Sequence, residues 1–238
     1  ESLYDYKIKD FCFIVGRTKR AVEDHFTPNF DLLDLLKKEK KKELHFELND
    51  FYKKLVKSNI MFVTQAKPVG FGDAIEYGKR FVTDDYFLLH AGDDIVISNK
   101  NSHLSRLENC FKKYKADIAC LIEKVENPSQ YGVVSGELLE DGIIDIKKIE
   151  EKPKKPKSKN AVIAIYIFKP KIFNYLSQVK KKSSAQNQLS DAFDMALKKG
   201  DRMIGVILNK NEKRIDIGTP ETYSKLLVSL KWKRKKFQ

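Results

Sequence analysis

The sequence predicts an α/β fold built around a Rossmann-like mixed sheet, and three features of the chain support this prediction. A buried-strand pattern at residues 11–15 is closed by Gly16 and followed by a helical pattern at residues 17–26, which is how a doubly wound unit opens. An apolar run at residues 86–89 stops at a Gly-Asp-Asp turn, which suits a strand buried on both faces of a parallel sheet. Over residues 131–168 the strands follow one another without helices, so we expect an inserted β-hairpin element.

The remaining elements follow from hydrophobic periodicity and from the turn residues between apolar segments. Apolar residues at helical spacing predict helices at residues 31–55, 73–81, 101–115, 170–176, 188–199 and 219–231. Short apolar or alternating runs bounded by turn residues predict strands at residues 60–64, 117–125, 131–138, 143–149, 160–168, 203–208 and 214–218. Asn29 or Asp31 is available to cap the first of these helices, and Thr219 followed by Pro220 opens the last.

Length and composition indicate one folded domain. The 238 residues are enough to bury a sizeable core and contain no long linker, so residues 1–238 are expected to form a single domain. A hydrophobic content of 42% with strong local periodicity argues against disorder. Residues 128–168 are expected to form a β-rich portion within this domain.

The cysteines and the apolar runs indicate the compartment. Cys12, Cys110 and Cys120 are odd in number, widely separated and without metal-ligand spacing, so we expect buried thiols in a reducing compartment. No apolar run approaches the roughly 18 residues of a membrane span, and no signal peptide opens the chain. We therefore expect a cytoplasmic protein with no membrane partner.

The chain is strongly basic, with a formal net charge of +13. Such a charge admits nucleic acid as a partner, but it also suits an enzyme whose substrates carry several phosphates. The tail around residues 231–236 would favour a nucleic-acid binder, yet the basic segments lack aromatic residues at regular intervals on which bases could stack. We interpret the lysine runs as solvated faces and expect no nucleic-acid partner; they lie at residues 37–42, 152–159, 180–182 and 231–236.

Two segments carry candidate chemistry before any family is considered. Asp93 and Asp94 end a predicted strand, and carboxylates at such an edge suggest a hard cation such as Mg²⁺, which needs only one or two protein carboxylates. The loop from Gln65 to Gly72 places glycines ahead of a helix and an amide that can pair with the edge of a base. A strand with a polar turn and a glycine turn with an exposed glutamine are the simpler alternatives.

Six segments occur in an order that resembles the prokaryotic UTP:glucose-1-phosphate uridylyltransferases, relatives of the glucose-1-phosphate thymidylyltransferases. The likeness covers essentially the whole chain and includes a run typical of the uridylyltransferase branch at residues 15–26. It implies the nucleotidyltransferase (GT-A-like) form of the mixed sheet. The six segments are Gln65 to Gly72, Gly92-Asp93-Asp94, Tyr131-Gly132, Glu151-Lys152-Pro153, Gln188 to Ala192 and Arg214 to Gly218.

This resemblance implies that UMP passes from UTP to glucose 1-phosphate, giving UDP-glucose and pyrophosphate, by in-line attack with Mg²⁺ as cofactor. Such a reaction requires positioning and charge neutralisation more than a nucleophilic side chain. A homo-oligomer is also implied, because family members often form dimers or tetramers.

The resemblance assigns a role to each of eight residues. Gln65 and Gly70 would contact the uracil, Asp93 and Asp216 would bind Mg²⁺, and Lys152 would neutralise the sugar phosphate during catalysis. Gly132, Glu151 and Gln186 would contact the sugar within the β-rich portion at residues 128–168, although the family usually has a carboxylate at the position of Gln186. The simpler alternatives are a solvated loop for Glu151 and Lys152, a helix-capping role for Asp216, and a turn role for Gly132.

The chain departs from the family at its beginning. Residue 1 interrupts a predicted helix, and the first strand and glycine-rich loop of the family, ending Gly-Thr-Arg, are absent from the sequence. We therefore expect an N-terminally incomplete domain that binds nucleotide poorly as given, because such loops hold the triphosphate. Two alternatives stay open: a glucose-1-phosphate thymidylyltransferase, and a catalytically silent paralogue that binds sugar nucleotides.

Overall fold

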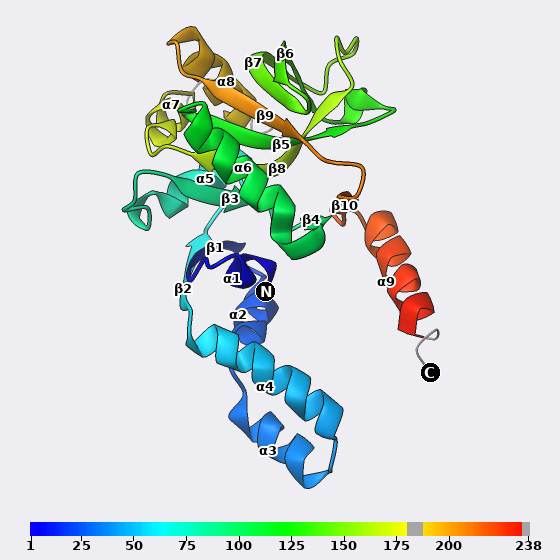
Figure 1. The fold of residues 1–238 in the computed structure, drawn as a ribbon. Helices are drawn as coiled ribbons and strands as arrows, with labels where there is room; N and C mark the ends of the chain where they lie inside the picture. Colours follow the sequence, from blue (N-terminus) through cyan, green and yellow to red (C-terminus); the bar gives the residue numbers. More distant parts are fainter. Residues whose placement is uncertain (180–187, 235–238) are drawn as a thin grey trace. The chain divides into compact units, whose positions relative to one another are not determined.

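The computed structural model describes residues 1–179 and 188–234, with side chains as far as residue 228 in the last helix. The chain divides into two compact units, Glu1–Phe81 and Val82–Gln238 (Figure 1). The N-terminal unit contains a small parallel sheet and a helical hairpin, and the C-terminal unit contains a larger mixed sheet.

The N-terminal unit is built on two parallel strands, β1 (Asp10–Gly16) and β2 (Asn59–Gln65), which pair in register from Asp10↔Asn59 to Gly16↔Gln65. The Asn29 side chain accepts a hydrogen bond from the backbone N–H of Leu32 at 3.0 Å, so the predicted cap at Asn29 is confirmed. Leu33, Tyr52 and Leu55 form the buried core of this unit. Its helices are α1 (Ser2–Asp5), α2 (Arg20–His25), α3 (Phe30–Lys38), α4 (Lys42–Val56), α5 (Phe71–Tyr77) and the 3₁₀ turn Gly78–Arg80.

The C-terminal unit contains a six-stranded sheet in the order β3-β8-β5-β9-β7-β6. Strand β6 also pairs with β8 through Val133 and Ala161, so the strands from β8 to β6 close on themselves. The pair β5–β9 is parallel and the other pairs are antiparallel, which confirms the predicted mixed sheet and its inserted hairpin β6–β7. The strands are β3 (Phe87–His90), β5 (Ile118–Lys124), β6 (Gly132–Glu140), β7 (Ile143–Glu151), β8 (Asn160–Phe168) and β9 (Met203–Ile207).

One strand prediction was wrong in its direction. The apolar run of β3 suggested a strand buried on both faces of a parallel sheet, but β3 lies at the edge and pairs antiparallel with β8. All four of its residues are half-buried. A local apolar run identifies a strand without identifying its neighbour, because the pairing depends on segments far along the chain.

A second, two-stranded sheet carries the acidic residues of interest. Strands β4 (Asp94–Ile97) and β10 (Lys213–Asp216) pair antiparallel, with Asp94 directly opposite Asp216. The 3₁₀ turn Asn99–Asn101 follows β4, and the 3₁₀ turn Pro128–Gln130 precedes β6.

Helices α6 and α8 of the C-terminal unit pack on the larger sheet. Helix α6 (Ser102–Lys113) runs across β5, β8 and β9, and α7 (Ile172–Val179) packs on α8 (Gln188–Lys198), which also reaches β7 (Figure 1). Helix α9 (Pro220–Arg234) follows β10, and the Thr219 hydroxyl accepts the N–H of Thr222, as predicted for its cap.

The strands of this unit are apolar because they form its buried core. Residues from Ile118 to Ile122 of β5 are at most 2% exposed, and Phe168, Phe193 and Leu107 pack in the same interior. Cys110 and Cys120 are buried free thiols, as predicted, whereas Cys12 is only half-buried. Within the described residues, no helix is long and apolar enough to cross a membrane.

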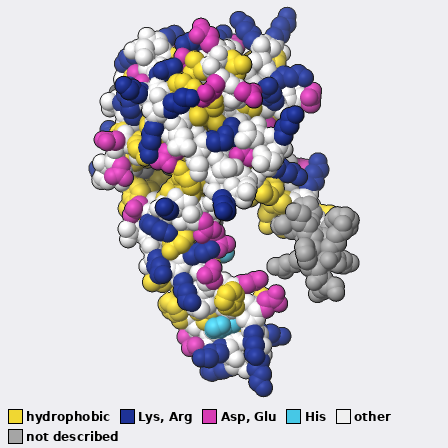
Figure 2. Space-filling view, in the orientation of Figure 1, with side chains coloured by type: hydrophobic (Ala, Val, Ile, Leu, Met, Phe, Trp, Pro, Cys, Tyr) yellow, Lys and Arg dark blue, Asp and Glu magenta, His cyan; other side chains and the backbone are white. Residues whose placement is uncertain are grey.

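On the face shown in Figure 2, the basic residues of the described chain do not gather into one patch. Lysines of the runs at residues 37–42 and 152–159 are exposed, as expected for solvated faces. On the face shown in Figure 2, Lys and Arg side chains lie among Asp and Glu side chains.

Candidate active site

The candidate site of the C-terminal unit begins at the antiparallel pair β4–β10. Asp94 opens β4 and lies opposite Asp216, the last residue of β10, while Asp93 lies in the turn just before β4. The backbone N–H of Ile217 donates to the carbonyl of Asp93 at 2.8 Å, which continues the pairing beyond the strands. Two short strands therefore bring the two predicted metal ligands, Asp93 and Asp216, to one end of a sheet.

Asp94 has a structural role in this arrangement. Its side chain is buried, with a residue exposure of 4%. One carboxylate oxygen accepts from Arg214 Nε at 2.6 Å, and the other accepts from the backbone N–H of Ala164 in β8 at 3.0 Å. Because both oxygens are occupied, Asp94 joins the small sheet to the large one and is not available to a ligand.

Asp93 has the opposite environment. Its side chain is exposed, and in the described part of the chain its carboxylate takes part in no hydrogen bond or ion pair. The Asp216 side chain is 37% exposed, and its Oδ1 accepts from the backbone N–H of Gly218 at 2.8 Å.

Gly218 shows that the two carboxylates face the same space. A Cβ atom placed on Gly218 would lie 3.0 Å from Asp93 Oδ2 and 3.2 Å from Asp216 Oδ1. Glycine at this position keeps open a small volume bounded by two carboxylate oxygens. This oxygen-only set fits a hard divalent cation such as Mg²⁺, which prefers oxygen ligands and retains waters or phosphate oxygens in its other positions. Residues 1–179 and 188–234 contain no group of three or more His, Cys, Asp or Glu side chains arranged to hold a metal, so the fit rests on two carboxylates.

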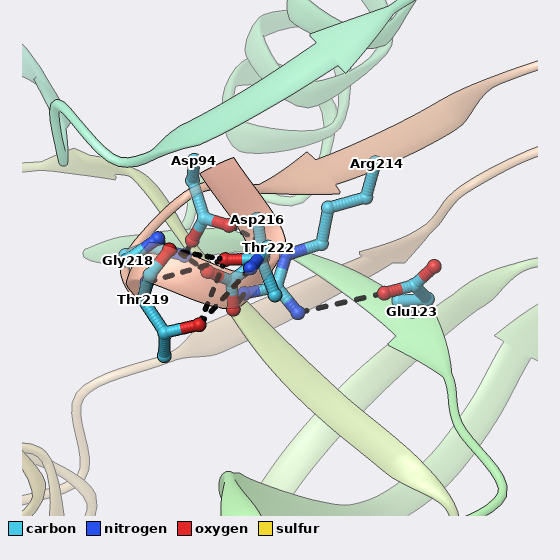
Figure 3. A network of polar contacts seen from close by, with 8 residues as sticks. Asp94, Glu123, Arg214, Asp216, Gly218, Thr219 and Thr222 are labelled. Carbon is cyan, nitrogen blue, oxygen red and sulfur yellow. Dashed lines mark hydrogen bonds and ion pairs between the residues drawn. The ribbon is translucent and has the colours of Figure 1, made fainter. Parts of the chain in front are cut away.

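Arg214 organises the acidic residues around this space (Figure 3). Its side chain is only 7% exposed and pairs with Asp94, with Asp216 at 3.4 Å and with Glu123 of β5 at 3.5 Å. Burial alone would lower the pKa of Arg214, but the hydrogen bond and charge of Asp94, with the charges of Asp216 and Glu123, raise it above its ordinary value. The guanidinium is therefore a permanent positive charge among carboxylates.

The predicted sugar-binding residues Gly132 and Glu151 lie directly opposite each other on β6 and β7. A Cβ on Gly132 would lie 3.1 Å from Glu151 Oε2, so glycine leaves room for the carboxylate. The Ser190 hydroxyl of α8 donates to the same Oε2 at 3.0 Å. Glu151 is thus held in place by its strand partner and by a helix.

Lys152 follows Glu151 in an unusual backbone conformation. Its φ is +42°, in the left-handed region that non-glycine residues rarely adopt, and its backbone N–H donates to the carbonyl of Tyr131 at 3.0 Å. Its side chain is exposed, and no carboxylate of the described residues pairs with its ammonium. A strained backbone that presents an unpaired cation is typical of a ligand-binding position.

Tyr166 of β8 reports the acidic character of this region. Its phenol is buried, and burial raises its pKa well above the ordinary value, with the neighbouring charges of Glu151 and Asp94 acting in the same direction. The carboxylates of Asp94, next to the predicted metal ligands, and of Glu151, a predicted sugar-binding residue, therefore both raise the pKa of this buried phenol.

The predicted uracil-binding residues lie in the N-terminal unit. Gln65 is 9% exposed, and its amide donates to the Asp73 carboxylate at 2.7 Å and to the carbonyl of Gly70 at 3.4 Å. Gly70 has a φ of +130°, which explains why glycine precedes α5. The structure thus brings Gln65 and Gly70 together, and Gln186 lies outside the described residues.

Three residues of the site were not assigned a role by the sequence: Arg214, Tyr131 and Ser190. All three lie within the segments that carry the family resemblance, so the sequence already pointed to these positions. Arg214 and Asp216 are two apart on a strand and share a face, which could have suggested their pairing. The contacts of Arg214 with Glu123 and of Ser190 with Glu151 connect distant parts of the chain, and no local pattern indicates them.

These features define a nucleotidyl transferase, and the chain belongs to this family, whose model matches residues 28–231. A protein of Methanocaldococcus jannaschii, whose name assigns it provisionally to the UTP–glucose-1-phosphate uridylyltransferases, is 35% identical over 92% of this chain and 75% of its own. The crystal structure of an apo UDP-glucose pyrophosphorylase matches with a TM-score of 0.86 and 29% identity, over 98% of this chain and 85% of that one. A UDP-glucose pyrophosphorylase complexed with UDP-glucose matches with a TM-score of 0.80 and 29% identity, over 98% of this chain and 84% of that one. The predicted family and fold class are confirmed.

Proposed function

We propose that the protein transfers UMP from UTP to glucose 1-phosphate, giving UDP-glucose and pyrophosphate, with Mg²⁺ as cofactor. The observation that carries this proposal is the pair of carboxylates, Asp93 and Asp216, that borders the open space at Gly218 in a member of the nucleotidyl transferase family. The similarity to UDP-glucose pyrophosphorylases favours uracil and glucose over other bases and sugars.

In the proposed reaction a phosphate oxygen of glucose 1-phosphate bonds to the α-phosphorus of UTP, and the bond to the β-phosphate oxygen breaks. The electron pair leaves with pyrophosphate, so no side chain need act as nucleophile. Mg²⁺, when bound, would neutralise triphosphate charge that develops during this displacement. Asp93 and Asp216 would hold the cation, and Arg214 would keep Asp216 in place.

The other predicted residues have the chemistry that the proposal needs. Lys152 presents an unpaired ammonium on an exposed segment, which suits the dianionic sugar phosphate. Glu151 retains acceptor capacity for sugar hydroxyls while Ser190 fixes its orientation. In the N-terminal unit, Gln65 and Gly70 would recognise the uracil edge, and Gln186 would contribute on the sugar side. We also propose that the protein works in the cytoplasm as a homo-oligomer.

The proposal is tested by measuring pyrophosphate release by the full-length protein from UTP and glucose 1-phosphate, with and without Mg²⁺. We expect Mg²⁺-dependent release that falls by at least about 100-fold in Asp93→Asn, because loss of a charge-stabilising group typically costs that much. Replacement of Asp84, an exposed aspartate outside the site, by Asn is the matched control and should leave the rate unchanged.

Two results would contradict the proposal. A marked preference for dTTP over UTP would make the protein a thymidylyltransferase. No release with any sugar phosphate and nucleotide would leave a silent paralogue that retains the fold.

A further inference from the structure

Arg214 contacts more of the candidate site than any predicted ligand does. It pairs with three carboxylates that come from three strands: Asp94 of β4, Glu123 of β5 and Asp216 of β10 (Figure 3). The shortest of these contacts, 2.6 Å to Asp94, is the most buried, and the contact with Asp216 reaches a predicted metal ligand. One guanidinium therefore sets the relative positions of the small sheet, the large sheet and a metal ligand.

The same guanidinium lies over an aromatic ring on the sugar side of the site. The Arg214 guanidinium carbon is 5.2 Å from the centre of the Tyr131 ring, within cation–π range. Tyr131 immediately precedes Gly132, and its carbonyl accepts the N–H of Lys152 at 3.0 Å. Tyr131 thus touches both the start of β6 and the end of β7, the two segments that carry the proposed sugar-phosphate groups.

We propose that Arg214 is a positioning residue that links the two substrate sides of the site, and that the Tyr131 ring is its contact with the sugar-phosphate side. This inference rests on the proposed function. In-line displacement requires the attacking phosphate oxygen and the α-phosphorus to be held at a fixed distance and angle. A residue that touches the segments carrying both groups is suited to set that distance without contacting either substrate.

The geometry requires arginine rather than any cation. A guanidinium offers several donors in one plane and a flat face, so it can pair with several carboxylates and stack on a ring at the same time. A lysine ammonium is a point charge, which could keep the pair with Asp94 but not, at the same time, the contact with the Tyr131 ring and the two longer ion pairs. Arg214→Lys therefore retains the positive charge but cannot make all the contacts with Asp216, Glu123 and the Tyr131 ring at once.

The experiment compares Arg214→Lys with Arg106→Lys in the full-length protein. Arg106 is a matched control, because it is also a partly buried arginine, with hydrogen bonds of 2.6 Å to Glu212 and to the carbonyl of Ile207, and it lies outside the site. We expect Arg214→Lys to raise both the half-saturating Mg²⁺ concentration and the KM for glucose 1-phosphate by at least about tenfold, the effect of one lost charge-assisted hydrogen bond. Arg106→Lys should lower the thermal midpoint and change neither value.

The cation–π contact is tested separately with Tyr131→Phe and Tyr131→Leu. The leucine variant removes the ring and should raise the KM for glucose 1-phosphate several-fold more than the phenylalanine variant, which keeps the ring, with little change in Mg²⁺ dependence in either. These variants keep the proposal testable if Arg214→Lys does not fold.

Several outcomes would overturn the proposal. One is an unchanged half-saturating Mg²⁺ concentration or an unchanged KM for glucose 1-phosphate in folded Arg214→Lys. Another is an equal KM for glucose 1-phosphate in Tyr131→Phe and Tyr131→Leu. Calorimetric binding of Mn²⁺ and of glucose 1-phosphate to the same variants gives a second readout that does not need turnover. If the wild type releases no pyrophosphate, the proposed function fails, and unaltered binding of both probes by Arg214→Lys would show separately that the positioning role fails.

Discussion

Asp93 and Asp94 are adjacent in sequence and have opposite environments, which makes them a test at the scale of single residues. Asp94 is buried with both oxygens occupied, and Asp93 is exposed without a partner among the described residues. We expect Asp94→Ala to lower the free energy of unfolding by about 3 kcal/mol, because it leaves the buried Arg214 short of its shortest ion pair. Asp93→Ala should change it by less than about 0.5 kcal/mol, as surface substitutions usually do, while abolishing turnover.

Urea unfolding followed by circular dichroism measures the two free energies. Equal unfolding midpoints for the two variants would show that the Arg214–Asp94 pair does not stabilise the fold as the structure indicates.

At the scale of single residues, the sequence could suggest Asp93 and Asp216 as metal ligands, but it could not show that Asp94 has a structural role instead. The two carboxylates were named because they lie in recognised segments in the right order. The sequence could not distinguish Asp93 from Asp94, since the difference depends on Arg214 and on the N–H of Ala164, both far along the chain. The assigned roles themselves stay predictions until they are measured.

At the scale of elements, the turn after β10 is expected to control access of the cation to the carboxylates. Gly218→Ala would place a Cβ 3.0 Å from Asp93 Oδ2 and 3.2 Å from Asp216 Oδ1, closer than ordinary van der Waals contact. The carboxylates would have to separate, so we expect the half-saturating Mg²⁺ concentration to rise by about tenfold, which corresponds to roughly 1.4 kcal/mol. Titration of pyrophosphate release with Mg²⁺ measures this change.

Gly92→Ala is the control for this prediction. It lies next to Asp93, but a Cβ there would meet nothing within 4 Å. Equal Mg²⁺ requirements in the two variants would mean that the space at Gly218 is not where the cation binds.

Elements were predicted better than their pairing. The hairpin β6–β7 was expected because two alternating runs flank Glu140, Asp141 and Gly142, and Gly142 indeed has a positive φ of +75° at the turn. The edge position of β3 and the closure of the sheet through Val133 and Ala161 were not predicted. Those contacts join segments widely separated in sequence, and local periodicity carries no information about them.

At the scale of the whole C-terminal unit, a buried polar network connects α6 with the segment before β10. Glu212 is 7% exposed and accepts hydrogen bonds from Ser102, Arg106 and the backbone N–H of Asn209. His103, which follows Ser102 on α6, is 2% exposed and shares a hydrogen bond of 2.6 Å with Ser98. The network attaches α6 to the segment around Glu212 by buried contacts, so protonation of a buried group beside it is expected to lower the stability of the unit.

His103 makes this unit sensitive to mild acid. Burial lowers its pKa to about 4, and the charges of His90 and Arg106 act in the same direction against the opposing charge of Glu212. Between the ordinary pKa near 6.5 and about 4, the unfolded chain binds a proton that the folded chain does not, so stability falls as the pH falls. We expect a loss of about 2 kcal/mol between pH 7 and pH 5 from this residue, measured by urea unfolding and absent in His103→Gln.

The choice of pH 5 separates this effect from those of the paired carboxylates. Burial alone would raise the pKa of Asp117, but hydrogen bonds from Lys169, Lys171 and the N–H of Arg202 lower it to about 2, so its stabilisation is lost only as the pH falls from about 4 towards 2. Burial alone would raise the pKa of Glu212, but hydrogen bonds from Asn209 and Ser102 and the charge of Arg106 lower it, so its stabilisation is lost as the pH falls from its ordinary pKa downward. The pKa of His90 is lowered by burial as well, so the His103 contribution is the difference between the wild type and His103→Gln. If both proteins lose the same free energy between pH 7 and pH 5, His103 is not the residue through which acid destabilises the unit.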